Sequence, residues 1–233
     1  MAGTGERKDE HRPFDAAAEA NRLVTYGTGV THSHYFDAEP TVGSRAGSFV
    51  TLPVGDRVLS LATDRGVFGG TSSVIDRGTA VLLKVAPPPA AEAVVLDLGC
   101  GYGPIASWAA ASCSSCRVWA VDVNERAVAL CAANASTSGL SNVTASLPDD
   151  VPADVRLDVI YSNPPIRIGK AALHSMLSRW LGRLRTPDGV AWLVVQRHLG
   201  ADSLADWMGG EGFAVSRVAS KTGYRVLRVV RDG

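Results

Sequence analysis

From residue 94 onward, short apolar runs alternate with helical stretches, and no other feature constrains the fold of this chain as strongly. The runs are continuous, as expected of strands that are buried on both faces of a parallel sheet. The predicted strands are residues 94–98, 118–121, 143–146, 157–161 and 190–195, and the predicted helices are residues 104–111, 125–135, 171–184 and 203–210. Two final strands, residues 213–219 and 224–230, leave no room for a helix and predict an antiparallel edge hairpin. The pattern predicts an α/β domain with helices on both faces of a mostly parallel sheet.

A smaller unit is predicted ahead of this domain. Two apolar runs around Gly55-Asp56 predict a β-hairpin within residues 48–63. Asp76 is the predicted N-cap of a helix over residues 79–85, which ends at three consecutive prolines.

We therefore expect three parts in the chain. Residues 1–30 are rich in small and charged side chains without periodicity, which predicts a mobile arm. Residues 31–86 form the predicted hairpin-and-helix extension, and residues 90–233 form the main domain.

Composition excludes several classes of protein. The 233 residues are 46% hydrophobic and 20% charged, which is ordinary for a globular domain. No apolar run approaches the roughly 20 residues that cross a bilayer, and the polar N-terminus does not resemble a secretory signal. Four cysteines in this length are no disulfide scaffold, and Cys113 and Cys116 have zinc-ligand spacing without a second such pair. We expect a cytoplasmic protein with no metal site and no membrane contact.

Charge is balanced overall but uneven along the chain. With 23 basic and 23 acidic residues, the protein has no global basic field that would attract nucleic acid. Residues 158–233, however, hold 11 basic and 6 acidic side chains, against 12 and 17 in the residues before them. An anionic partner would therefore meet the C-terminal part, although two ends of a sheet can also differ in charge by chance.

Three motifs follow predicted strands. Gly99, Gly101 and Gly103 come directly after the first strand, where glycines allow a sharp turn and close approach to a ligand at a helix N-terminus. Asp97, inside that strand, needs an N–H-rich or positive partner. Asp122 ends the second strand about 20 residues later, where a carboxylate can accept from both hydroxyls of a ribose. A helix N-cap at Asp122 or Asn124 is the alternative role for this motif.

The third motif, Asn163-Pro164-Pro165, follows the fourth predicted strand. Two prolines fix the backbone and remove two N–H donors, so the loop presents carbonyls and the Asn163 amide. A site built from acceptors suits a substrate that carries N–H groups, such as an exocyclic amine or an amide.

Together the three motifs resemble those of class I S-adenosylmethionine-dependent methyltransferases that modify planar amino nitrogens. The longer string from Ser162 to Lys170 resembles the methyltransferase small-domain family, which includes small-subunit ribosomal RNA guanine-N2 methyltransferases and their single-domain relatives. The strings His34-Tyr35-Phe36, Thr63-Asp64-Arg65-Gly66-Val67-Phe68 and Asp76-Arg77-Gly78-Thr79 also match those relatives. The resemblance covers about residues 34–231 and implies a Rossmann-like, seven-stranded sheet whose last strand is antiparallel.

The resemblance also implies roles for individual residues. The residues implied to bind S-adenosylmethionine are Asp97, Gly99, Cys100, Gly101, Gly103, Asp122, Val123, Asp149 and Asn163. The residues implied to act in methyl transfer are Asn163, Pro164, Pro165 and Ile166, and those implied to bind the substrate are Phe68, Arg167 and Lys170. Two positions depart from the commoner pattern. Ile166 stands where an aromatic residue usually stacks on the target base. Asp149 is assigned to the adenine although Leu147 and Pro148 intervene after the strand.

The resulting hypothesis is a methyltransferase that acts on an exocyclic amino group of RNA, with guanine N2 of small-subunit ribosomal RNA as its target. A protein glutamine amide would suit the same loop, but the enzymes that modify it carry Tyr at the position of Ile166. A noncatalytic cofactor-binding module is disfavoured by the intact Asp97, Asp122 and Asn163. A dehydrogenase is disfavoured by Pro104, which replaces the last glycine of the dinucleotide fingerprint.

Overall fold

The computed structural model describes residues 48–64, 67 and 74–231. The predicted arm of residues 1–30 and the predicted substrate residue Phe68 lie outside the described residues.

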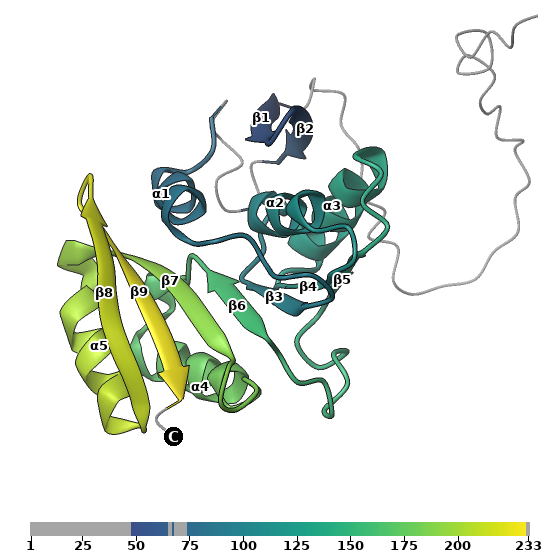
Figure 1. Cartoon of the computed structure of the whole chain (residues 1–233). Helices are drawn as coiled ribbons and strands as arrows, with labels where there is room; N and C mark the ends of the chain where they lie inside the picture. Colours follow the sequence, from purple (N-terminus) through teal and green to yellow (C-terminus); the bar gives the residue numbers. More distant parts are fainter. Residues whose placement is uncertain (1–47, 65–66, 68–73, 232–233) are drawn as a thin grey trace, which may run out of the picture. The chain divides into compact units, whose positions relative to one another are not determined.

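A seven-stranded sheet forms the centre of the described chain, with the strand order β5-β4-β3-β6-β7-β9-β8 (Figure 1). Its strands are β3 (Val94–Leu98), β4 (Arg117–Val121), β5 (Val143–Ser146), β6 (Val159–Ser162), β7 (Val190–Gln196), β8 (Phe213–Lys221) and β9 (Tyr224–Arg231). The first five are parallel, whereas β9 runs antiparallel to both β7 and β8. The predicted fold is confirmed. The C-terminal hairpin lies at one edge of the sheet, where β8 is the edge strand and β9 lies between β8 and β7.

Helices cover both faces of the sheet (Figure 1). On one face, α1 (Arg77–Val85), α2 (Pro104–Ser112) and α3 (Glu125–Thr137) contribute to one apolar core. On the other face, α4 (Lys170–Leu181) and α5 (Ala201–Gly210) contribute to a second core. Residues 147–158, between β5 and β6, contain no helix, so a loop crosses part of this second face.

The predicted N-terminal hairpin is present as β1 (Ser48–Val54) and β2 (Arg57–Thr63), which pair antiparallel. The buried side chain of Asn134 in α3 fixes β2 in place. Its Oδ1 accepts from the Ala62 N–H at 2.8 Å, and its Nδ2 donates to the carbonyls of Ala62 at 2.9 Å and Tyr102 at 2.8 Å. The hairpin therefore shares a core with α2 and α3. The division into an extension and a main domain remains a prediction.

The predicted C-terminal end of helix α4 is wrong. The sequence predicts helix to residue 184, but α4 ends at Leu181. The chain then turns so that Arg185 donates its N–H to the Leu157 carbonyl and Leu157 donates to the Arg183 carbonyl, both at 2.9 Å. This pairing outside the sheet also explains why β6 begins at Val159 and not at Leu157.

Candidate active site

A pocket of about 480 Å³ lies at the carboxyl ends of β3, β4 and β6. Five residues that the sequence predicts for the site line it: Gly99, Asp122, Val123, Asn163 and Pro165. A smaller hollow beside it is lined by Cys100, Gly101, the N-terminal residues of α2 and the start of α1. Gly99 and Asn163 line both spaces, so they are adjoining parts of one site.

The glycine loop is tied to the neighbouring strand. The N–H groups of Gly99 and Cys100 donate to the Val121 carbonyl at 2.8 and 3.0 Å. Gly103 has a φ of +89°, and a Cβ there would lie 2.6 Å from the Cys131 Sγ, so both conformation and space require glycine. Cys100 is buried, and its pKa is raised by contact with the Cys131 thiol and by burial. Cys100 therefore fills space under the loop as a neutral thiol.

Asp97 is fully buried at the end of β3. Its Oδ2 accepts from the Ala106 N–H of α2 at 2.8 Å, which supplies the N–H partner that the sequence predicts. Its Oδ1 has no hydrogen-bond partner among the described residues. Burial raises the pKa of Asp97 to about 8, the Ala106 N–H opposes this shift, and the negative charge of Asp122 adds to it. One buried carboxyl oxygen is thus available to a donor or a cation.

Asp122 connects the glycine loop to the start of α3. Its Oδ2 accepts from the Gly101 N–H at 3.0 Å, and its Oδ1 accepts from the Asn124 N–H at 2.9 Å. The N-cap of α3 is Asn124, whose Oδ1 accepts from the Arg126 N–H at 3.0 Å. Each Asp122 oxygen has a second lone pair, so the carboxylate can also accept from a ligand's hydroxyls.

Asn163 follows β6 and contacts the first turn of α1. Its Nδ2 donates to the Asp76 Oδ2 at 2.8 Å and to the Thr79 Oγ1 at 3.2 Å. The Pro164 carbonyl accepts from the Ile166 N–H at 2.9 Å, which closes a short turn. From the sequence, Asp76 is predicted only as a helix cap. The match of residues 76–79 to the single-domain relatives was the one sign that Asp76 has a further role.

The sequence matches the methyltransferase small domain over residues 58–228, most of the chain. The chain belongs to the methyltransferase small-domain family. A relative that is 31% identical over 198 residues is the uncharacterized protein YbxB of Bacillus subtilis, with 84% of this chain and 96% of that protein aligned. Ribosomal RNA small subunit methyltransferase C of Alcanivorax borkumensis is 30% identical over 162 residues, which are 67% of this chain and 48% of that enzyme. This chain therefore spans only about half of that relative's length.

Among solved structures, the fold is similar to the Thermus thermophilus 16S rRNA N2 G1207 methyltransferase in complex with AdoMet and guanosine. The TM-score is 0.65 at 22% identity, over 78% of this chain and 50% of that one. The similarity shows a shared fold and agrees with the family assignment.

Several residues predicted for this methyltransferase site do not line the pocket. Ile166 packs against the core on the α4 face, while Ile168, in the same 3₁₀ turn (Ile166–Ile168), lines the pocket. Arg167 and Lys170 are exposed beside it.

The predicted adenine residue, Asp149, is 90% exposed and pairs with Arg179 at 2.8 Å. Pro148 and Arg179 line the pocket in its place. Sequence reasoning missed Arg179 because its contacts with residues 148–149 cross about 30 positions of sequence. The adenine role of Asp149 stays a prediction.

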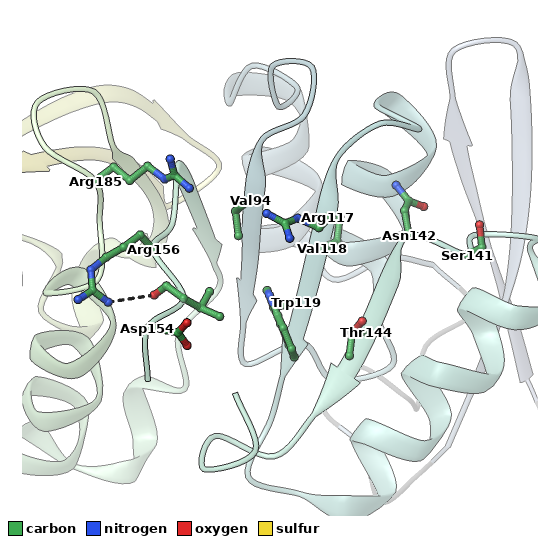
Figure 2. Close-up of a pocket in the computed structure, with 11 residues that line it drawn as sticks. Val94, Arg117, Val118, Trp119, Ser141, Asn142, Thr144, Asp154, Arg156 and Arg185 are labelled. Carbon is green, nitrogen blue, oxygen red and sulfur yellow. Dashed lines mark hydrogen bonds between the residues drawn. The ribbon is translucent and has the colours of Figure 1, made fainter. Parts of the chain in front are cut away.

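A second hollow, of about 640 Å³, lies toward the amino ends of β3 and β4 (Figure 2). Figure 2 shows Arg117 on β4 and Arg185 after α4 on its two sides, with Trp119 below Arg117. None of the residues that line it is a predicted site residue. The candidate site is therefore the smaller pocket, because ligands of open α/β sheets bind at the carboxyl ends of the strands.

Three further findings bear on the sequence predictions. Cys113 and Cys116, considered above only as zinc ligands, are joined by a disulfide between α2 and β4. In the described part of the chain, no three His, Cys, Asp or Glu side chains gather as a metal site would require. No helix there is long and apolar enough to span a membrane.

Proposed function

We propose that this protein methylates an exocyclic amino group of RNA, with guanine N2 of small-subunit ribosomal RNA as the target. The observation that carries the proposal is the Asn163-Pro164-Pro165 loop at the end of β6, beside the glycine loop and Asp122. Acceptors for N–H groups thus adjoin the space for a methyl donor. The names of the ribosomal RNA methyltransferase relatives support RNA as the substrate.

The methyl donor is S-adenosylmethionine, and the described residues fit it. Asp97 offers one buried, unpartnered oxygen to the amino group of the methionine part. Asp122, with free lone pairs beside the glycine loop, is suited to the ribose hydroxyls. Gly99 and Gly101 line the site and leave room beside the backbone for the ligand to approach, while Gly103 lets the loop pack closely on Cys131.

When bound, the cofactor supplies an activated methyl group, so the protein needs no nucleophile of its own. Asn163 Oδ1 and the Pro164 carbonyl accept the two N–H groups of the target amine and hold its nitrogen in place. The nitrogen gains positive charge as its new C–N bond forms and the S–CH₃ bond breaks, so these two oxygens would favour the transition state. One proton leaves the nitrogen afterwards and passes to water.

The substrate base has to leave its stack to reach these acceptors. Pro165 and Ile168 line the pocket and offer apolar contact at the base, and Arg167 and Lys170 are exposed where phosphates would pass. The same proposal includes a contact between Phe68 and the substrate. It also includes binding of this protein to the small ribosomal subunit.

The proposal is tested by incubating the protein with radiolabelled S-adenosylmethionine and, separately, total RNA, ribosomal subunits and a protein extract. We expect label in RNA, recovered as N2-methylguanosine after digestion to nucleosides, and far less label in the same time with Asn163→Ala. Label on glutamine in the protein fraction alone would replace the proposal with the amide alternative. Label in another methylated nucleoside would change the target while keeping RNA as the substrate.

A further inference from the structure

The first turn of α1 meets the Asn163 loop in a way that the proposed reaction does not explain. The Asp76 Oδ2 accepts from the Asn163 Nδ2 at 2.8 Å, across 87 positions of sequence. The same Oδ2 accepts from the Thr79 N–H at 3.0 Å, as the N-cap of α1. We propose that Asp76 is a positioning residue of the methyl transfer, which holds the Asn163 amide so that only Oδ1 can meet the target amine. This inference rests on the proposed function.

The chemistry of the contact fixes which way the amide faces. An ionised carboxylate only accepts hydrogen bonds, so only the amino end of the Asn163 amide can face Asp76. The Thr79 Oγ1 lies 3.2 Å from the same Nδ2, so both of its hydrogens have a protein acceptor. The Asn163 side chain therefore has no N–H left for the substrate, and its Oδ1 is the side-chain atom that remains to accept one.

The turn is also built for close approach. A Cβ on Gly78 would lie 2.9 Å from Cε1 of Tyr224, 3.1 Å from the Asp76 Oδ2 and 3.3 Å from the Asn163 Nδ2. A side chain at this position would therefore press on Tyr224, Asp76 and Asn163, and these side chains would have to shift to make room. The close approach of α1 to Asn163 gives a physical reason for a glycine within the string Asp76-Arg77-Gly78-Thr79.

Charge adds to the geometric effect. A carboxylate bonded to the amino end of an amide polarises it and makes its oxygen a better acceptor. Hydrogen bonding to Asp76 would thus make the Asn163 Oδ1 more negative, and this oxygen faces the nitrogen that becomes positive. The helix-and-hairpin extension thereby supplies a residue on which the reaction depends.

Asp76→Ser and Asp76→Asn separate this role from helix capping. Ser and Asn are both good N-caps, so α1 is retained in each variant. Ser is too short to reach Asn163, whereas Asn keeps an oxygen at the same place without the charge. Arg77→Ala, in the same turn, is the matched control.

The first readout needs no activity. The side-chain NH₂ resonances of Asn163 are identified by NMR as those lost in Asn163→Ala. We expect Asp76→Ser to shift them, and Arg77→Ala to leave them in place. Unchanged Asn163 resonances in Asp76→Ser would overturn the proposed contact, whatever the enzyme methylates.

The second readout is a double-mutant cycle on single-turnover methylation, with S-adenosylmethionine affinity measured by calorimetry for each variant. We expect Asp76→Ser to slow the reaction by about 10- to 100-fold and Asp76→Asn to recover part of the loss. Cofactor affinity should change by less than about threefold, a loss smaller than a full hydrogen bond.

In the Asn163→Ala background, Asp76→Ser should cost nothing further, because Asp76 acts through Asn163. An equal loss in both backgrounds would overturn the proposal. A parental rate for Asn163→Ala itself would instead overturn the proposed function, while the NMR result would still report on the contact.

Discussion

Asp97 gives this protein a pH dependence of stability that its sequence composition does not suggest. The side chain is fully buried, and its pKa is raised from 3.8 to about 8 in the folded state. Between these values the folded state holds a proton on Asp97 that the unfolded state has lost. Folding is therefore stabilised at low pH by this residue, and the stability falls as pH rises toward the folded-state pKa.

One proton of difference corresponds to about 1.4 kcal/mol per pH unit in the free energy of unfolding. Asp97→Asn cannot ionise, so it should remove this slope, although its amide leaves a different hydrogen bond at the Ala106 N–H. The comparison is therefore one of slopes and not of absolute stabilities. The free energy of unfolding is measured by urea denaturation of both proteins from about pH 5 to pH 7. The difference, parent minus variant, should fall by roughly 3 kcal/mol over that range, and equal slopes would refute the reasoning.

Three further predictions concern cofactor, substrate and fold. Asp122→Ala should lower S-adenosylmethionine affinity at least about tenfold by calorimetry, since two ribose acceptors are lost; unchanged affinity would mean that the ribose is held elsewhere. Arg167→Ala and Lys170→Ala should each weaken RNA binding and reduce its salt slope by about one unit without affecting cofactor affinity; parental RNA binding in both would remove them from the substrate surface. Asn134→Ala should lower the free energy of unfolding by roughly 3 kcal/mol, because it leaves the Ala62 N–H and two carbonyls without partners; a loss under about 1 kcal/mol would show that water replaces the amide.

The features that could be predicted from the sequence are those that depend on residues close together along the chain. The glycine loop, the position of Asp122 and the Asn163-Pro164-Pro165 loop each follow directly from a strand, so the topology of a parallel sheet brings them to one edge. The hairpin β1–β2 was predictable for the same reason, because Gly55 and Asp56 select a two-residue turn between matched apolar runs.

The remaining features depend on contacts between distant segments. The Asp76–Asn163 hydrogen bond joins residues 87 positions apart, and no local pattern encodes it. The loop after β5 has no periodicity, and Arg179 of α4 fixes it through Pro148 and Asp149. At the Asn163 loop, the 3₁₀ turn decides that Ile168 lines the pocket and Ile166 packs on the core. A 3₁₀ turn has three residues per turn, so Ile166 and Ile168 point to different sides of it. The sequence pattern at the end of a strand does not show that such a turn follows.

The central claim is that the Asn163 side chain accepts the target amine, while the glycine loop and Asp122 supply the main hold on the cofactor. The most direct measurement is single-turnover methylation of RNA by Asn163→Ala at saturating S-adenosylmethionine, with cofactor affinity measured on the same preparation. We predict parental affinity and a rate about 10² to 10³ times lower, because one acceptor of developing charge is removed. Asn163→Asp should recover only part of the rate, since its carboxylate would face Asp76 at the 2.8 Å now spanned by a hydrogen bond. An Asn163→Ala protein that methylates RNA at the parental rate would contradict the account.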